Sequence, residues 1–207
     1  MNEHGAIAQL KRGGIDGLDM LMQLHQVRVV RTAFLITRDR ALAEDVVQTA
    51  FVRVYERIDQ FNLDRAFEPW FLRIVTNDAV KAAMRRERFV PLTAPGDVAQ
   101  TLDDLFSTNQ LGPDAAPEAA ELQQAVWTAL GHLPPEQRAV IVRRYYLDMS
   151  ETEMADDLLV PHGTIKSRLR AARQWLRTLL SPWQITYEPT STQPDAHAIS
   201  DQPEATQ

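Results

Sequence analysis

The amino-acid sequence predicts an all-α fold of two small helical domains, and three observations lead to that prediction. Apolar residues recur at three- and four-residue spacing in both halves of the chain, as one buried face of a helix requires. Prolines, glycines and acids interrupt this pattern once in the middle of the chain and again near its end. No stretch alternates between apolar and polar residues over more than a few positions, so β-strands are not expected.

Two acidic segments divide the chain. Residues 90–121 contain six acids and residues 181–207 contain four, and neither segment contains Lys or Arg. Because the whole chain of 207 residues has a formal net charge of −6, the remaining residues sum to a net positive charge. We therefore expect two mildly basic bodies, and a nucleic-acid partner is compatible with them despite the negative total.

The composition of each segment sets the predicted boundaries. Pro and Gly among scattered acids favour an extended linker, and Pro amid Ser, Thr, Gln and Asp favours disorder. We expect, in chain order, a flexible N-terminus over 1–15, a helical domain over 16–90, a flexible acidic linker over 91–120, a second helical domain over 121–181 and a disordered C-terminal tail over 182–207. A tail that docks through Trp183 and Ile185 stays an alternative.

The composition also excludes several classes of protein. The chain has no cysteine, which removes disulfides and thiolate sites and favours a reducing cytoplasm. Its apolar runs are much shorter than the roughly 20 residues of a membrane-spanning helix, and Met1–Leu10 has no signal-peptide core. Scattered histidines and the lack of a glycine-rich phosphate loop argue against a metal or cofactor. We expect a cytoplasmic protein without membrane insertion, cofactor or enzymatic activity.

Helical periodicity is clear in the first body. The stretch Ala41–Ile58 has an apolar face formed by Leu42, Val46, Ala50, Phe51, Val54 and Ile58, and its opposite face is polar. A second helix is predicted from the same spacing in Phe67, Trp70, Phe71, Ile74 and Val75.

A helix-turn-helix is predicted in the second body. Pro134 and Pro135 mark the start of a helix, because the missing N–H of proline costs nothing there. Ser150 and Glu153 match a capping box, which predicts a short helix that carries Met154, Ala155 and Leu158 inward. The sequence breaks that helix near Leu159-Val160-Pro161, and a basic helix follows from about His162 to Leu180.

The basic helix has two separate stripes and no acid. Its apolar stripe contains Ile165, Leu169, Ala172, Leu176 and Leu179, and its cationic stripe contains Lys166, Arg170, Arg173 and Arg177. Like charges at this spacing mildly destabilise an isolated helix, so an anionic partner such as the DNA major groove would offset that cost. The alternative is a basic face that only contacts solvent.

The residues of this motif resemble a known family. Met149–Ala155 (MSETEMA) and Val160–Leu169 (VPHGTIKSRL) closely resemble the promoter −35 binding region of the extracytoplasmic-function (ECF) sigma factors. The resemblance implies that His162, Thr164, Lys166, Ser167 and Arg170 face the −35 element, with Arg168 and Arg173 near phosphates. Two residues depart from the family pattern: Leu159 stands where glycine is usual, and Asp157 where an apolar residue is usual. If Leu159 adopted a left-handed conformation, the strain would be roughly 1–2 kcal/mol.

The first body contains an aromatic-edged loop beside a cationic stripe. The polar loop runs from Asn62 to Ala66 between Phe61, Phe67 and Trp70, and the following helix carries Arg73, Asn77, Lys81 and Arg85 on one face. Such a surface suits single-stranded DNA, since cations follow the backbone and an unstacked base is held by stacking and hydrogen bonds. A core role is the alternative for the aromatics; it is preferred for Phe71 and Ile74 and left open for Trp70. For Asn77 the alternative is a solvated side chain.

This region also resembles the ECF sigma factors. Ala43–Phe51 (AEDVVQTAF) and Phe67–Asn77 (FEPWFLRIVTN) look like two characteristic stretches of the sigma −10 and core-binding domain. The resemblance implies that Asp45 and Gln48 contact the clamp helices of core RNA polymerase, although Asp45 is also compatible with a solvated carboxylate. It further implies that Phe61 to Phe67 with Asn77 receive a −10 base, that the linker threads through the polymerase, and that an anti-sigma factor covers both DNA surfaces.

The sequence thus predicts an alternative sigma factor with core RNA polymerase and promoter DNA as partners. A helix-turn-helix regulator that acts without core polymerase is the alternative, and it would leave the aromatic loop and the stripe that begins at Arg73 unexplained.

Overall fold

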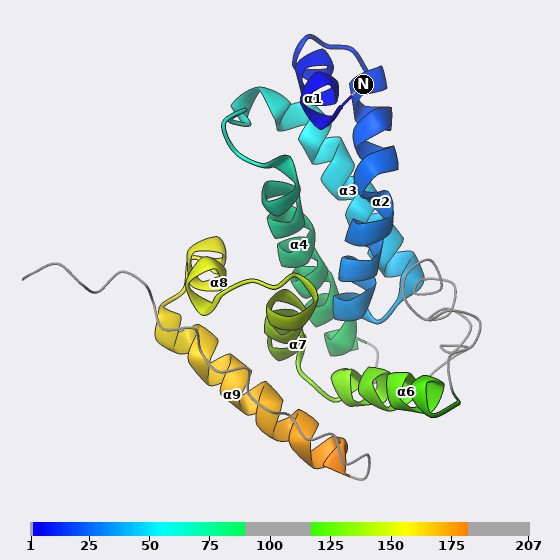
Figure 1. Ribbon diagram of the computed structural model, residues 1–207, viewed down its shortest axis with the longest axis vertical. Coiled ribbons are helices and arrows are strands. Elements are labelled where there is room, and N and C mark those ends of the chain that lie inside the picture. Colours follow the sequence, from blue (N-terminus) through cyan, green and yellow to red (C-terminus); the bar gives the residue numbers. More distant parts are fainter. Residues whose placement is uncertain (1, 90–116, 182–207) are drawn as a thin grey trace, which may run out of the picture.

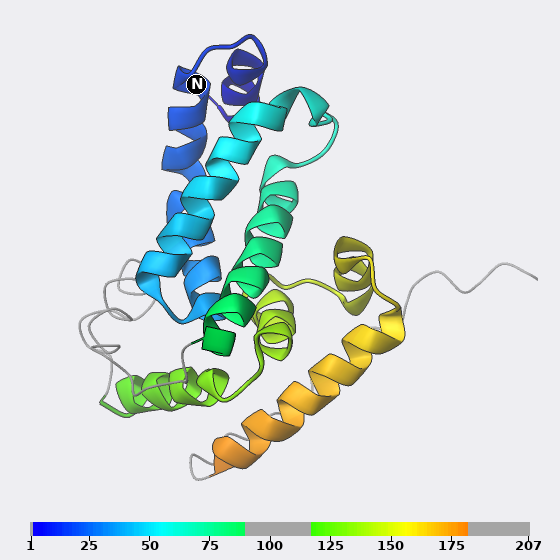
Figure 2. The ribbon, with the colours of Figure 1, turned by 180° about the vertical axis from the view of Figure 1, so that it is seen from behind.

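The computed structural model describes residues 2–89 and 117–181, and every regular element in these ranges is helical (Figures 1 and 2). The first body consists of α1 (Glu3–Lys11), α2 (Asp16–Thr37), α3 (Arg40–Arg57), the 3-10 turn η1 (Ile58–Gln60) and α4 (Phe67–Phe89). The second consists of α6 (Pro117–Gly131), α7 (Pro135–Ile141), the π-helical segment η2 (Val142–Tyr146), α8 (Glu151–Leu158) and α9 (His162–Leu179). The predicted all-α fold is confirmed.

The first body is a bundle of α2, α3 and α4, with α1 packed on one end of it (Figure 1). The apolar faces predicted for α3 and α4 point into this bundle, where Val54, Phe71 and Val75 are completely buried. Asp39 caps α3 by accepting a 2.8 Å hydrogen bond from the backbone N–H of Leu42. Burial of one face of each helix therefore holds the bundle together.

The predicted flexible N-terminus over 1–15 is wrong for most of its length. α1 is capped by Asn2, whose side chain accepts a 3.0 Å hydrogen bond from the backbone N–H of Gly5, and Ile7 and Leu10 are buried. α1 approaches α2 so closely that a Cβ on Gly17 would lie 2.4 Å from the carbonyl oxygen of Ala6. A nine-residue helix is marginal alone, so packing on α2 stabilises a helix that the local sequence does not predict.

The second body contains the predicted helix-turn-helix. Pro135 stands in the first turn of α7, and Ser150 and Glu153 form both hydrogen bonds of the capping box at the start of α8. Leu159 ends α8 in a left-handed conformation with φ 53° and ψ 43°, and α9 begins three residues later, directly after Pro161. Ile165, Leu169 and Ala172 of the predicted apolar stripe of α9 are buried, whereas Leu176 and Leu179 are only partly buried.

The predicted linker over 91–120 is too long at its C-terminal end. α6 already begins at Pro117, because proline is well tolerated in the first turn of a helix. Prolines alone therefore do not mark the end of the linker. The rest of the predicted linker and the predicted tail over 182–207 lie outside the described residues.

The two bodies pack directly against each other. α7 contacts both α2 and α4, and η2 contacts α2. Trp127 of α6 stacks on Phe34 of α2 with ring centroids 4.6 Å apart and an interplanar angle of 19°. The sequence predicts the two bodies but not this contact between them. Within residues 2–89 and 117–181, no helix has the length and apolarity to cross a membrane.

Candidate nucleic-acid interface

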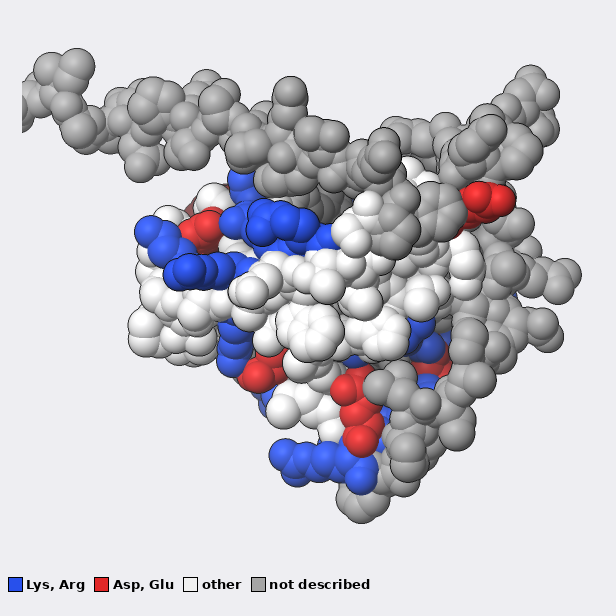
Figure 3. Space-filling view, turned by 90° about the horizontal axis from the view of Figure 1, so that it is seen from below, with Lys and Arg blue, Asp and Glu red and all other residues white. Residues whose placement is uncertain are grey.

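One candidate surface is the outer face of α9. Its apolar stripe packs against α7 and α8, which leaves the cationic stripe on the outside. His162, Lys166, Ser167 and Arg170 are exposed, and Thr164, Arg168 and Arg173 are partly exposed. Figure 3 shows Lys and Arg side chains gathered over α9, on the left of the view, with fewer acids among them. A helix with this exposed face has the shape and charge for a major groove.

Several of the predicted −35 residues already have partners within the protein. Arg168 donates from Nη2 to Glu136 Oε1 at 2.6 Å, and Arg173 donates from Nε to the hydroxyl of Tyr145 at 3.0 Å. Ser167 donates to the carbonyl oxygen of Thr164 at 2.9 Å. Among the described residues, Lys166, Arg170 and Arg177 have no such partner, so they are the cations of this face that are most available to an anion.

The two departures from the family pattern behave differently. Leu159 has the left-handed conformation for which glycine is best suited, and its side chain is 82% exposed. Asp157 is half-buried on α8 and faces the first body, with Oδ1 3.9 Å from Arg73 Nη1. Burial raises the pKa of Asp157, although Arg143 and Arg73 act in the opposite direction. Asp157 therefore joins the two bodies, which an apolar residue could not do by charge.

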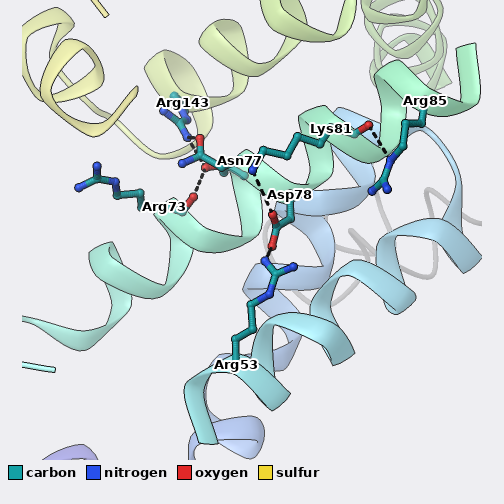
Figure 4. Close-up of polar contacts among 8 residues, drawn as sticks. Arg53, Arg73, Asn77, Asp78, Lys81, Arg85 and Arg143 are labelled. Atoms are coloured by element: carbon teal, nitrogen blue, oxygen red, sulfur yellow. Dashed lines mark hydrogen bonds and ion pairs between the residues drawn. The ribbon is translucent and has the colours of Figure 1, made fainter. Parts of the chain in front are cut away.

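A second candidate surface lies along α4, and Figure 4 shows its residues. Lys81 and Arg85 are exposed, whereas Arg73 and Asn77 are partly exposed. Lys81 Nζ lies 3.9 Å from Asp78 Oδ1, and Arg85 Nε donates to the carbonyl oxygen of Lys81 at 3.4 Å. The four predicted residues follow one face of a single helix, as their spacing indicates.

The aromatic residues beside this surface differ in exposure. Phe61 and Phe67 are 4% and 0% exposed, and their rings pack with Trp70 at centroid distances of 5.0 and 5.7 Å. Both phenylalanine rings are buried in this structure, so the part of Phe61 and Phe67 in receiving a −10 base stays a prediction. Trp70 is partly exposed and is the aromatic side chain of this cluster that reaches the surface.

The loop between η1 and α4 is anchored rather than loose. Asn62 accepts a 3.0 Å hydrogen bond from the backbone N–H of Asp64, which closes a local turn. Lys11 of α1 donates from Nζ to the carbonyl oxygen of Phe61 at 2.7 Å. Residues 62–66 remain exposed on this support, so the loop is presented to solvent with a defined backbone at its start.

A groove between α2 and α3 contains one of the predicted polymerase contacts. It has a volume of about 490 Å³ and is lined by Met22, Gln26, Val27, Val30, Arg31, Arg40, Glu44, Val47, Gln48 and Phe51. Its apolar floor and charged rim have the composition of a surface that receives another helix. Asp45 is exposed on α3, next to this lining rather than within it.

Sequence reasoning missed two arginines that link the bodies. Arg138 and Arg143 are each 1% exposed. Arg143 donates from Nη2 to Thr76 Oγ1 and, at 2.9 Å, to Asn77 Oδ1, as Figure 4 shows. Burial lowers the pKa of Arg143 to about 10, although Asp157 acts in the opposite direction. The departure of Asp157 from the family pattern is the one sequence signal that pointed to this contact.

The two bodies match two models of one protein family. The model described as Sigma-70 region 2 matches residues 21–89, and the model described as Sigma-70, region 4 matches residues 123–176. The first match contains α3, α4 and the aromatic loop, and the second contains the helix-turn-helix.

Similar proteins agree with these matches. The chain is 31% identical over 163 residues to ECF RNA polymerase sigma factor SigL of Mycobacterium tuberculosis (strain ATCC 25618 / H37Rv), which covers 78% of this chain and 88% of that protein. The structure of CnrH in complex with the cytosolic domain of CnrY is similar with a TM-score of 0.58 and 25% identity, over 87% of this chain and 97% of that one.

A third similarity supports the fold alone. It is to the co-crystal structure of the sigma factor RpoE in complex with the anti-sigma factor NepR from Bartonella quintana, with a TM-score of 0.55 and 24% identity, over 79% of this chain and 97% of that one. Taken with both family matches and the identity to SigL, the chain belongs to the sigma-70 family as an ECF RNA polymerase sigma factor, which directs promoter-specific transcription by RNA polymerase.

Proposed function

We propose that this sigma factor reads a promoter at two places, the −35 element through α9 and the −10 element through α4 and the loop before it. The observation that carries the proposal is that one chain presents two cationic helical faces, each in a separate family domain. Phosphate contacts by such faces supply affinity, and the side chains that reach bases supply specificity.

At the −35 element, Lys166 and Arg170 are the primary contacts. They are exposed, they follow one face of α9, and they are four residues apart. His162, Thr164 and Ser167 lie near the N-terminus of the same helix, which is the end that faces base edges in a helix-turn-helix. To bind phosphates, Arg168 must release Glu136 and Arg173 must release the hydroxyl of Tyr145.

At the −10 element, Asn77 and Trp70 are the candidate base contacts. Asn77 offers an amide that can pair with a base edge, and Trp70 offers the surface aromatic ring beside the exposed loop that starts at Asn62. Arg73, Lys81 and Arg85 follow the strand backbone. Phe61 and Phe67 support this surface from the core.

Core RNA polymerase is proposed to dock on the groove between α2 and α3. Gln48 lines it, Asp45 lies beside it, and the exposed apolar side chains of Val27, Val52 and Tyr55 widen the contact area. These three side chains are 46–57% exposed in the free protein, and a docked helix of the polymerase would bury them.

An anti-sigma factor is proposed as a further partner. One solved relative is in complex with the anti-sigma factor NepR, and its fold matches this chain over most of its length. The chain is also proposed to act in the cytoplasm, where its relatives act on RNA polymerase, and to work by binding rather than by catalysis.

Transcription in vitro tests the proposal. Purified protein with core RNA polymerase is expected to start transcripts at a promoter mapped after overexpression of the protein, and core polymerase alone is not. A helix-turn-helix regulator would start transcripts only with another sigma factor present. Transcription that depends on such an added factor would overturn the proposal.

A further inference from the structure

One helix of the first body lies outside both family matches and still reaches the −10 surface. α1 precedes residues 21–89, which the region 2 model matches. It packs against α2 and against η1, at the end of the bundle where the loop between η1 and α4 begins (Figure 2). α1 is therefore placed to act on that loop.

The start of the loop is bonded to α1. Lys11, in the last turn of α1, donates from Nζ to the carbonyl oxygen of Phe61 at 2.7 Å and to that of Asp59 at 3.4 Å. Asp59 belongs to η1, and Phe61 follows η1 directly. Carbonyl groups at the end of a helical turn lack partners within the turn, so a cation is favourable there. One ammonium group thus fixes the backbone from which the loop starts.

The end of the loop is also linked to α1, through a residue of α2. Phe67, the first residue of α4, is completely buried, and the centroid of its ring lies 5.3 Å from that of His25. Nε2 of His25 lies 2.9 Å from Oε2 of Glu3 on α1. Phe61 and Phe67 pack edge to face, with their ring centroids 5.7 Å apart. Both residues that flank the loop are therefore held by a set of contacts that includes α1.

The loop between these two ends is exposed along its whole length. Residues 62–66 are all exposed. The backbone N–H of Arg65 donates to the carbonyl oxygen of Asn62 at 3.1 Å, and the backbone N–H of Asp64 donates to the Asn62 side chain at 3.0 Å. Both bonds lie within the loop, so they shape its turn without fixing where the turn sits on the bundle. The position of the loop beside α4 depends on its two ends.

We propose that Lys11 is a positioning residue for the −10 surface, which holds residues 62–66 in the conformation that receives an unpaired base without touching DNA itself. The inference rests on the proposed function, since it concerns how the same loop is prepared. A loop that already has its bound conformation loses less conformational entropy when its ligand binds. Without the bond from Lys11 to Phe61, the DNA strand must order the loop as it binds. Affinity then falls only for DNA that uses the loop.

Holonzyme assembled with core RNA polymerase tests the effect on DNA binding. The probe is a fluorescein-labelled non-template strand that covers the −10 element of a promoter at which the protein starts transcription. Lys11→Met keeps the length of the side chain and removes its charge and its donors. This variant is expected to bind the strand about five- to tenfold more weakly than the wild type does.

Two matched variants separate the bond from the charge. Lys11→Arg keeps a cation with N–H donors and is expected to recover most of the affinity. Arg12→Met removes a cation from the next position, which is exposed, and is expected to bind like the wild type.

Strands that lack one base at a time separate positioning from folding. For the strand that lacks the base received by the loop, Lys11→Met and the wild type are expected to bind equally, because neither complex uses the loop. A variant that had merely lost its fold would bind every strand more weakly.

The mobility of the loop is measured in the full chain without DNA. Because the chain has no cysteine, a nitroxide attached at Ala66→Cys, an exposed position, reports on the loop alone. Lys11→Met is expected to narrow the lines of the electron paramagnetic resonance spectrum, which indicates faster motion. Lys11→Arg and Arg12→Met are expected to leave the spectrum unchanged.

Three results would overturn the inference. The first is binding of the intact strand by Lys11→Met holoenzyme as tight as that of the wild type. The second is a loss of the same factor for the intact strand and for every strand that lacks a base. The third is a nitroxide spectrum of equal width in Lys11→Met and the wild type. Wild-type holoenzyme that started no transcripts would instead contradict the proposed function.

Discussion

Leu159 has a left-handed backbone conformation, which is strained for a residue with a Cβ. It has φ 53°, a region in which a Cβ is strained by roughly 1–2 kcal/mol, and its side chain is 82% exposed, so it contributes little packing. Leu159→Gly is therefore expected to stabilise region 4 by about 1 kcal/mol, measured as the free energy of unfolding in urea. Leu159→Ala keeps the Cβ and is the control. Equal effects of both substitutions would contradict the argument from strain.

Lys166 is expected to contribute a phosphate or base contact at the −35 element. Lys166→Ala should weaken binding of a −35 duplex and lower the slope of log affinity against log salt by about 1. Arg12→Ala removes the same charge from an exposed position after α1 and should leave the slope unchanged. Titrations by fluorescence anisotropy at several salt concentrations check both variants. An unaltered slope for Lys166→Ala would exclude the contact.

Trp70 separates promoter binding from promoter opening. Trp70→Ala is expected to leave −35 duplex binding unchanged and to impair opening of the −10 region by holoenzyme, because a stacked base contributes roughly 1–3 kcal/mol. Permanganate reactivity of unpaired thymines measures opening. Trp70→Phe retains an aromatic ring and should recover part of the activity. Normal opening by Trp70→Ala would remove the base-contact role.

The exposure of most candidate site residues could be predicted from the sequence, because exposure depends on position along one helix. The spacing of Lys166 and Arg170 fixes them on one face of α9 wherever that helix lies. The burial of Phe61 and Phe67 could not be predicted, since spacing does not show whether an aromatic ring faces a core or a groove. Their burial depends on packing with His25, Trp70 and Phe71, which belong to other turns and another helix.

At the scale of elements, the capping box of α8 should make region 4 sensitive to acid. Glu153 accepts a 2.7 Å hydrogen bond from the backbone N–H of Ser150, and this bond lowers the pKa of Glu153 below its ordinary value of 4.5. Its contribution to stability is present above the unfolded value and is lost as the pH falls through the lower folded value.

Thermal unfolding from neutral pH to below 4.5 checks this prediction. Wild-type region 4 is expected to lose more stability over this range than Glu153→Gln, in which the group does not titrate. Glu121→Gln, which removes a carboxylate without a capping role, should follow the wild type. Identical pH profiles for Glu153→Gln and the wild type would show that the cap contributes no pH dependence.

α1 is expected to be part of the cooperative unit of region 2. Ile7 is 1% exposed, so Ile7→Ala should lower the free energy of unfolding by about 2–4 kcal/mol through lost burial and a cavity. His4→Ala changes an exposed residue of the same helix and serves as the control. Chemical denaturation followed by circular dichroism measures both. If Ile7→Ala lowered the free energy of unfolding by no more than His4→Ala does, α1 would not be folded against α2 in solution.

The comparison of α1 with α8 and α9 shows which elements a sequence reveals. α8 and α9 have a capping box, a turn and a long periodic stripe, which are all local signals. α1 has nine residues and three buried positions, and its stability comes from contact with α2, which no local pattern encodes. The start of α6 at Pro117 is hidden for a related reason, since proline occurs both in linkers and in first turns of helices.

At the scale of the whole molecule, the arrangement of the two bodies was the feature least accessible from sequence. Net charge and composition separate region 2 from region 4, but Arg143 and Asn77 are 66 residues apart and meet only through tertiary packing. Asp157 indicated that something unusual lies on α8 without indicating its partner, Arg73. Contacts of this kind form between surfaces built from several helices, so the pattern of one helix does not predict them.

The proposed function requires that one protein contacts the polymerase and two promoter elements. The most direct test measures binding of the full chain to core RNA polymerase. The fluorescence anisotropy of the labelled protein reports the binding. A saturable one-to-one complex, weakened by Gln48→Ala in the groove between α2 and α3 and unaffected by Arg12→Ala, is the expected result. No binding to core polymerase, with −35 duplex binding intact, would contradict the account.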